Sequence, residues 1–308
     1  MKPIRITSVA VGAALALSLA ACGSDPTKAD PGDTPSTSGG TVSIVVGSAA
    51  FGESEILAEI YAGALKAQGI DASTKLDIGQ REAYIGALQD GSINVFPEYS
   101  GNLLTYFDPK ATATAPDDVV AALETALPDE LEVLTPSAAE DKDSYNVTSE
   151  LASKYGLQSI GDLKNVPDLS LAGNPELKTR VYGLPGLEKV YGLSDITFTA
   201  ISDSGGPATL KALTSGQVDV ADIYSTTPSI TQNHLVTLDD PEHLIAAQNV
   251  IPLLRKDADS ATVDDVLNAV SAKLTTQSLL DLNATFNGPD KPKASDVAAD
   301  WLQQNGFA

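Results

Sequence analysis

Cysteine, histidine, tryptophan and positive charge are all scarce in this 308-residue sequence. The single cysteine excludes an intramolecular disulfide, and the two histidines leave few candidates for a metal site or a catalytic triad. Lys and Arg number 19 against 41 Asp and Glu, which gives a net charge of −22. This acidity argues against nucleic acid and other polyanions as partners, although an acidic surface that serves only solubility also explains it.

The one cysteine ends a segment that is typical of a bacterial lipoprotein signal. Lys2 and Arg5 form a basic start, and the apolar segment 9–19 is too short to span a bilayer but suits a signal sequence. Leu-Ala-Ala-Cys at 19–22 matches the lipobox pattern. We therefore expect residues 1–21 to be a cleaved signal peptide and Cys22 to carry a lipid that anchors the protein outside the cytoplasmic membrane. A plain secretory peptide in which Cys22 has no role is the alternative.

Residues 22–40 are expected to form a flexible tether. After Cys22 this segment consists almost entirely of Gly, Ser, Thr, Pro, Asp and Ala, and it has no large apolar side chain. Such a composition cannot bury enough surface to fold. The folded part should begin near Thr41, and no later apolar run is long enough to cross a membrane.

Strand and helix patterns alternate through the rest of the chain. Segment 42–46 has the composition of a buried strand, and segment 53–68 has an apolar face with helical spacing that ends before Gly69. We therefore expect an α/β protein with mostly parallel sheets. The other strands are expected at 93–96, 131–134, 168–172, 196–200 and 218–223, and the other helices at 81–90, 117–127 and 208–214 and near 263, 277 and 297.

An internal repeat links two of these strands. Residues 87–100 align without gaps with residues 212–225, and each copy contains a helix end, a glycine, a short apolar strand and then a tyrosine, Tyr99 or Tyr224. Ligands bind beyond the carboxyl ends of the strands in open parallel sheets, so the repeat predicts two similar lobes that face each other across a cleft. Coincidence between two ordinary helix–glycine–strand units is the alternative.

Three blocks of sequence carry a family resemblance. They are Gly-Ser-Ala-Ala-Phe-Gly-Glu-Ser-Glu-Ile-Leu at 47–57, Phe-Pro-Glu-Tyr-Ser-Gly at 96–101 and Asp-Ile-Tyr-Ser-Thr at 222–226. In type and order they resemble the OpuAC-type binding proteins for glycine betaine, carnitine and choline, which serve ABC importers. Segments 154–163 and 186–192 extend the resemblance over essentially the whole mature domain.

The resemblance implies a two-lobed, hinged fold like that of periplasmic binding proteins. Each lobe would hold a mostly parallel sheet flanked by helices, with the ligand cleft between the lobes. One lobe would contain residues 41–140 and 225–308 and the other residues 141–224, with crossings near 137–143 and 224–228. A small-molecule ligand, permease and ATPase partners, no cofactor and a monomeric state are the further implications.

Candidate ligand contacts follow from the chemistry of a quaternary ammonium group, which has no N–H to donate. Aromatic faces hold it by cation–π contacts of about 0.5–2 kcal/mol each, and a carboxylate adds attraction. Tyr99 and Tyr224 match cage tyrosines of the family, and Phe51 and Thr226 belong to the same blocks. Ser48, in a loop that enters a helix N-terminus, is a candidate for the anionic end of a zwitterion. Tyrosines that pack at strand ends with bonded hydroxyls are the alternative.

The chain departs from the family pattern in two places. Glu-Asp-Lys-Asp at 140–143 replaces the Asn-Asn-Thr-Tyr of relatives, so Asp143 stands at a tyrosine position, and Asp141 and Asp143 become candidate contacts. Leu184 stands where relatives often have another aromatic residue, while Arg180 matches a retained arginine. A betaine and a larger or differently charged solute both remain open as ligands. A solvated crossover at 140–143 and a salt bridge at Arg180 are the alternatives.

The sequence favours a binding protein over an enzyme. His234 and His243 lie in polar segments, and neither a serine-elbow motif nor metal-ligand spacing accompanies them. We expect no catalytic or metal-binding residues, and a mechanism in which the lobes close on the ligand. A sensor or assembly lipoprotein with the same fold is the rival interpretation, and an extracellular hydrolase is another.

Overall fold

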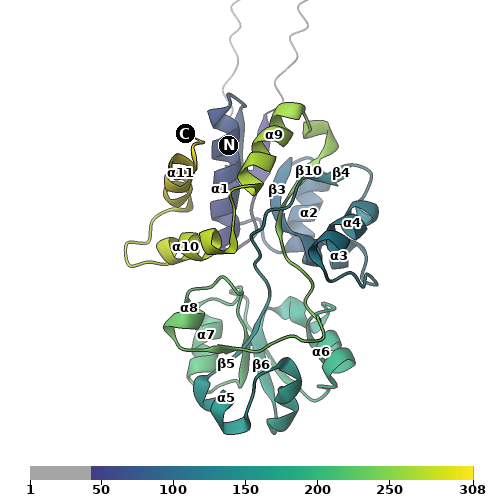
Figure 1. Cartoon of the computed structure of the whole chain (residues 1–308), viewed down its shortest axis with the longest axis vertical. Helices are drawn as coiled ribbons and strands as arrows, with labels where there is room; N and C mark the ends of the chain where they lie inside the picture. Colours follow the sequence, from purple (N-terminus) through teal and green to yellow (C-terminus); the bar gives the residue numbers. More distant parts are fainter. Residues whose placement is uncertain (1–42, 308) are drawn as a thin grey trace, which may run out of the picture. The chain divides into compact units, whose positions relative to one another are not determined.

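The structure is a computed structural model that describes residues 43–307. This part of the chain contains two five-stranded sheets, each with helices packed around it (Figure 1). We call the part built on the first sheet lobe 1 and the part built on the second sheet lobe 2. The predicted signal peptide, the tether and Cys22 lie outside the described residues, so their predictions stay predictions.

Lobe 1 is built from both ends of the described chain. Its sheet has the order β2-β1-β3-β10-β4. The strands are β1 (Ile44–Gly47), β2 (Ala72–Lys75), β3 (Val95–Tyr99), β4 (Leu131–Val133) and β10 (Val250–Arg255). The helices are α1 (Gly52–Ala67), α2 (Arg81–Gln89), α3 (Ser100–Phe107), α4 (Pro116–Ala126), η3 (Lys256–Ala258), α9 (Ala261–Ser271), α10 (Thr276–Phe286) and α11 (Ala294–Asn305).

Lobe 2 is inserted between β4 and β10. Its sheet has the order β7-β6-β8-β5-β9. The strands are β5 (Tyr145–Val147), β6 (Ser170–Gly173), β7 (Thr197–Ala200), β8 (Val220–Asp222) and β9 (Val236–Thr237). The helices are α5 (Ser149–Tyr155), η1 (Ile160–Asn165), η2 (Pro175–Lys178), α6 (Leu184–Tyr191), α7 (Pro207–Thr214) and α8 (Ser229–Gln232).

The two sheets have equivalent strand orders, which confirms the internal repeat. β1 corresponds to β6 and β3 to β8, and each pair occupies the same position in its sheet. Both sheets are mixed, because one strand in each, β10 or β5, runs antiparallel to its two neighbours. The expectation of mostly parallel sheets is therefore right for strand direction, since the other strands of each sheet run the same way.

The return crossing from lobe 2 to lobe 1 lies later than the sequence predicted. We expected it near 224–228, but β9 pairs with β5 in the second sheet, and Leu238 and Ile245 belong to the core of lobe 2. Lobe 2 thus continues past residue 224, and the chain returns only as it approaches β10. The boundary that the family resemblance implied at the tyrosine motif is therefore wrong: the motif stays in lobe 2, although Thr226 contacts Glu53 of lobe 1.

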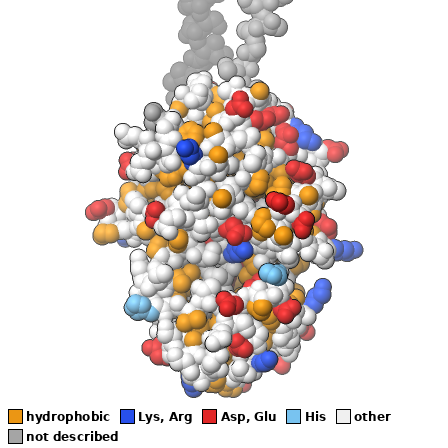
Figure 2. All heavy atoms as spheres, in the orientation of Figure 1, with side chains coloured by type: hydrophobic (Ala, Val, Ile, Leu, Met, Phe, Trp, Pro, Cys, Tyr) orange, Lys and Arg blue, Asp and Glu red, His pale blue; other side chains and the backbone are white. Residues whose placement is uncertain are grey.

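Separate apolar cores hold the two lobes. In lobe 1 one cluster joins α1 to α9, α10 and α11, and another lies on the side of α2, α3 and α4. In lobe 2 the main cluster surrounds Tyr145, Leu171 and Leu187. Outside these cores, carboxylates are scattered over the face seen in Figure 2 and are far commoner there than Lys and Arg. None of the helices in residues 43–307 has the length and apolar character needed to span a bilayer.

Candidate functional site

A cavity of about 70 Å³ lies between the two lobes. Lobe 1 contributes residues from the loop after β1, from α2, from the end of β3 and from α3, and lobe 2 contributes residues that follow β6 and β8. The segment that first crosses between the lobes completes the wall. The lining residues are Ala49, Phe51, Gln80, Arg81, Tyr84, Phe96, Tyr99, Asn102, Asp141, Asp143, Asn174, Glu176, Leu177, Arg180, Tyr182, Asp222 and Tyr224.

The repeat brings its two tyrosines to opposite walls of this cavity. Tyr99 is the last residue of β3, and Tyr224 follows β8 by two residues. Phe51 lies between them at the N-cap of α1, where its extended backbone carries the ring into the cavity. Its ring centroid is 6.1 Å from that of Tyr99 and 5.4 Å from that of Tyr224. The structure thus brings together three of the aromatic residues that the sequence singled out.

The cavity is also lined by three aromatic rings that the sequence analysis did not select as ligand contacts. Tyr84 from α2 stacks on Phe96, with centroids 3.9 Å apart, and Tyr182 enters from the loop after η2. Leu184, which stands at an aromatic position of the family, instead packs against the core of lobe 2. Tyr182, two residues earlier, supplies a ring on that side, so the wall is richer in aromatic residues than the family pattern suggested.

Three aspartates face the same space. Asp141 and Asp143 come from the crossing segment, and Asp222 is the last residue of β8. Burial raises the pKa of all three carboxyls; the Asp143 charge raises that of Asp222 further, and the Glu53 charge raises that of Asp141. Each of these carboxyls therefore gives up its proton less readily than a solvent-exposed aspartic acid does.

Gly173 explains how lobe 2 brings Asp222 so close to η2. This glycine ends β6, and a Cβ there would lie 2.4 Å from Leu177 Cδ1 and 3.1 Å from Asp222 Cβ. The first distance is shorter than real Cβ contacts and the second is tight, so a side chain at 173 would force Leu177 to move and would press on Asp222. The position matches Gly47 at the end of β1, where a Cβ would lie 2.5 Å from Ile93 Cδ1.

Both arginines of the wall already have carboxylate partners. Arg81 donates from Nε and Nη2 to Glu98, at 2.7 and 3.0 Å, in a buried pair. Arg180 of lobe 2 pairs with Glu82 of lobe 1 at 2.7 Å, so this ion pair bridges the two lobes. Arg180, a candidate ligand contact, therefore lines the cavity and also forms the salt bridge that the sequence analysis kept as the alternative.

Glu53 joins the first helix of lobe 1 to the tyrosine motif of lobe 2. Its carboxyl accepts hydrogen bonds from Tyr99 Oη at 2.6 Å, Thr226 Oγ1 at 2.7 Å and Asn283 Nδ2 at 2.6 Å. The side chain is buried, and burial raises its pKa, although these hydrogen bonds lower it in part. Thr226 thus acts on Glu53 and, like Ser48, is not among the residues that line the cavity.

Ser48 serves the loop after β1. Its Oγ accepts from the backbone N–H of Asp77 at 2.9 Å and donates to the carbonyl of Ala49 at 3.1 Å. These bonds fix the turn that delivers Phe51, so the hydroxyl predicted for the anionic end of a ligand is already used within the protein.

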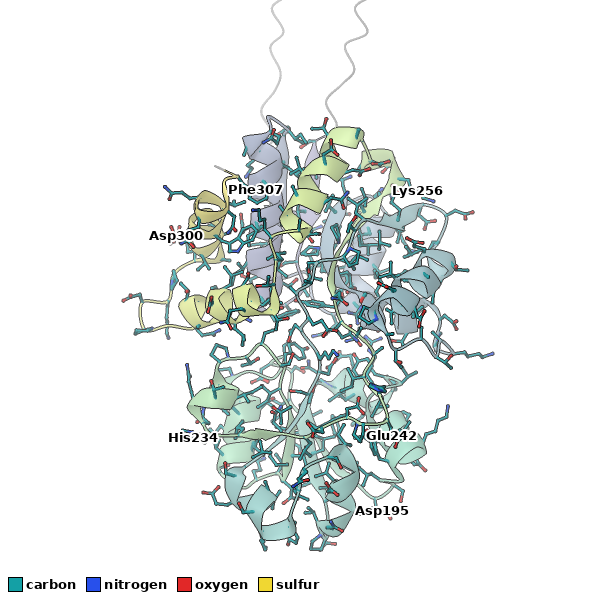
Figure 3. The ribbon with its side chains drawn as sticks, in the orientation of Figure 1. Asp195, His234, Glu242, Lys256, Asp300 and Phe307 are labelled. Carbon is teal, nitrogen blue, oxygen red and sulfur yellow. The ribbon has the colours of Figure 1, made fainter. Side chains whose placement is uncertain are left out.

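The two histidines lie away from the cavity. His234 and His243 are exposed, and Figure 3 shows His234 at the edge of lobe 2. Their exposure agrees with the polar sequence segments in which they lie. Among residues 43–307, no three His, Cys, Asp or Glu side chains are grouped as a metal site requires.

Known proteins are similar to this chain in fold and in sequence. Glycine betaine-binding protein YehZ of Escherichia coli (strain K12) is 29% identical over 282 residues, which cover 86% of this chain and 91% of that protein. The solved structure of apo YehZ from the same species matches with a TM-score of 0.61 at 26% identity, covering 87% of this chain and all of that one. The crystal structure of a glycine betaine/carnitine/choline ABC transporter protein matches with a TM-score of 0.69 at 21% identity, covering 86% of this chain and 99% of that one.

One family accounts for nearly all of the described chain. Residues 42–304 match the substrate binding domain of ABC-type glycine betaine transport systems, OpuAC. The matched region contains both lobes and every residue of the cavity wall. The protein therefore belongs to the OpuAC family of substrate-binding domains, and its fold is the two-lobed α/β fold of periplasmic binding proteins.

Proposed function

We propose that this protein is the extracytoplasmic receptor of an ABC importer and captures a quaternary ammonium osmoprotectant between its lobes. The observation that carries the proposal is the cavity wall, where aromatic rings from both lobes meet a group of carboxyls. A quaternary ammonium lacks N–H groups, so aromatic faces and a nearby carboxylate are what a protein can offer it. The relatives, named for glycine betaine, carnitine and choline, support the same ligand class.

In this proposal Phe51, Tyr99, Tyr182 and Tyr224 form the cage around the ammonium group. Because these rings belong to different lobes, a ligand contacts all of them only when the lobes are closed. Its differential affinity for the closed form then drives closure, and the permease recognises the closed receptor. Arg180, through its ion pair with Glu82, adds a direct link between the closed lobes.

The lipid anchor at Cys22 belongs to the same proposal. A lipid on Cys22 and a flexible tether of residues 22–40 would keep a monomeric receptor close to its permease, and this raises its effective concentration there without a tight interface. Cys22→Ala should release the protein from membranes into the medium. Cell fractionation tests this, and a variant that stays in the membrane fraction would remove the anchor from the proposal.

A pair of variants at Tyr224 tests the ligand class. Tyr224→Ala should weaken binding of glycine betaine or choline at least tenfold in titration calorimetry, since it removes one aromatic face. Tyr224→Phe is the matched control, because it keeps the ring and loses only the hydroxyl that accepts from Asn174 Nδ2. We expect its affinity to stay within about threefold of wild type; equal affinity of the alanine variant would remove Tyr224 from the site.

A thermal-shift screen tests the class as a whole. A ligand at a hundredfold its Kd stabilises the folded state by about 2.7 kcal/mol. Quaternary ammonium compounds should shift the melting temperature and their non-methylated amine analogues should shift it less. If only non-quaternary compounds shift the melting temperature, the proposed ligand class is wrong.

A further inference from the structure

Two carboxyl groups lie at neighbouring positions in the cavity wall. Asp143, from the crossing segment, and Asp222, at the end of β8, both line the cavity, and Asp222 pairs in the sheet with Tyr145, two residues after Asp143. Two carboxyls in such a place can hydrogen-bond with each other only if one of them holds a proton. The amide of Asn102 in lobe 1 donates to Asp143 Oδ2 at 2.9 Å and fixes the pair from the other side of the cleft.

The pair has no cationic partner of its own among the described residues. Arg81 acts on Asp143 through its charge, but it makes its two short contacts with Glu98, and the other arginine of the wall is paired with a glutamate as well. The remaining ionisable neighbours are Asp141 and Glu176 and the phenols of Tyr145, Tyr182 and Tyr224, none of which is positively charged. Burial raises the pKa of both carboxyls; the Asp143 charge raises that of Asp222 further, whereas Asn102 and Arg81 lower that of Asp143 in part, and on balance the pair favours a bound proton.

The wall also offers acceptors that the described protein does not use. Asp222 Oδ1 and Glu176 Oε2 are buried and have no hydrogen-bond partner within residues 43–307. Buried acceptors without partners cost stability, and a ligand that supplies a donor recovers that cost. Unpartnered acceptors and excess carboxyls match a cation that carries a hydroxyl or an N–H; they oppose the carboxylate of a zwitterion.

We propose that Asp143 and Asp222 form a proton-sharing pair that selects, within the quaternary ammonium class, a net cation with a hydrogen-bond donor over a zwitterion, and that the pair releases its proton when such a cation binds. The proton passes to solvent, and the cation's charge replaces it beside the two carboxylates. This inference rests on the proposed function, but it makes its own claim about which member of the class is bound and how pH acts on binding.

Choline and glycine betaine are the probes, because choline is a cation with a hydroxyl and glycine betaine is a zwitterion without a donor. Titration calorimetry of the purified protein at pH 7 should give choline at least tenfold higher affinity. Repeating the choline titration in phosphate and in Tris, which differ in ionisation enthalpy, should show that up to one proton is released. Choline affinity should rise from pH 5 to pH 7, while that of glycine betaine should change less than threefold.

Asparagine variants distinguish a specific effect of the two aspartates from the general effect of removing one negative charge. Asp143→Asn and Asp222→Asn should each abolish proton release and reduce the preference for choline to less than threefold. Asp195→Asn is the matched control: it removes the same charge from an exposed position at the edge of lobe 2 (Figure 3) and should leave both unchanged. If a variant does not fold, the two-buffer measurement on the wild type still decides.

The possible failures are distinguishable. Equal affinities for choline and glycine betaine, with no buffer-dependent heat, would overturn the role of the pair and leave the proposed function standing. A preference for glycine betaine would do the same. Binding of neither compound would overturn the proposed function and this inference with it.

Discussion

Two substitutions of Glu53 should have very different effects on stability. The Glu53 carboxyl accepts hydrogen bonds from Tyr99, Thr226 and Asn283. Asp141 is a second buried carboxyl close enough for the two charges to interact. Glutamine keeps one acceptor oxygen for Thr226 and Asn283, and its amide can donate to Tyr99 Oη, whose hydroxyl rotates. Alanine leaves all three donors without the carboxyl.

The magnitude follows from counting the orphaned groups. After Glu53→Ala, Thr226 Oγ1 and Asn283 Nδ2 still lie 3.1 Å apart and can pair, but the Tyr99 hydroxyl has lost its acceptor. A buried unsatisfied polar group costs about 1–3 kcal/mol, and the space left by the side chain adds to this. We expect a loss of about 3 kcal/mol for Glu53→Ala and about 1 kcal/mol or less for Glu53→Gln.

Urea denaturation followed by circular dichroism measures the difference. The urea concentration at the unfolding midpoint should fall markedly for Glu53→Ala and little for Glu53→Gln. The dependence of the unfolding free energy on urea concentration should stay unchanged. Burial raises the pKa of Glu53, so wild type loses the stability tied to the bound proton as pH rises through the folded pKa. The difference in unfolding free energy between wild type and Glu53→Gln should therefore become smaller as pH rises. Equal losses for the two variants would refute the account of Glu53 as a hydrogen-bond acceptor.

Three further predictions concern the cavity wall. Burial raises the pKa of Asp222, so the stability that its protonated carboxyl contributes is complete below the unfolded pKa near 3.8 and is lost as pH rises through the folded pKa. The melting temperature of wild type should therefore fall relative to that of Asp222→Asn between pH 5 and pH 8. Arg81→Met strands the buried Glu98 and should cost about 3–5 kcal/mol in chemical denaturation, with partial recovery when Glu98→Gln is added. Arg180→Ala should cost at most about 1 kcal/mol, because Glu82 is 57% exposed, yet stopped-flow measurements should show faster ligand release.

The sequence predicted the positions of most elements because their apolar periodicity was strong. It also predicted that Tyr99 and Tyr224 would be equivalent, since a repeat of strand and tyrosine fixes where each side chain leaves its sheet. It did not predict β10, the strand beside β3 in lobe 1. Pro252 interrupts that apolar run, and a proline argues against an interior strand, yet here it lies opposite Pro97 of β3.

The rest of the site depended on tertiary contacts that no local pattern records. Tyr84 and Arg81 project from a helix whose sequence does not say which face meets lobe 2. Tyr182 comes from a loop, and only the folded chain shows that it lines the cavity while Tyr145, closer to the family's tyrosine position, is buried with its hydroxyl donating to the carbonyl of Tyr182 at 2.7 Å. Asp143 was the exception, because a gapless comparison with the family pattern had singled it out and it lies in the cavity wall.

The insertion of lobe 2 between β4 and β10 also limits the order in which a chain that emerges from its N-terminus can fold. All of lobe 2 emerges before β10 does, and β10 is the strand that connects β4 to the rest of the lobe 1 sheet. Lobe 2 can therefore fold while lobe 1 still holds only β2, β1 and β3 in a partial sheet with an open edge. The lobe 1 sheet and the ligand cleft cannot be complete before β10 has emerged, and until then β3 has an unpaired edge.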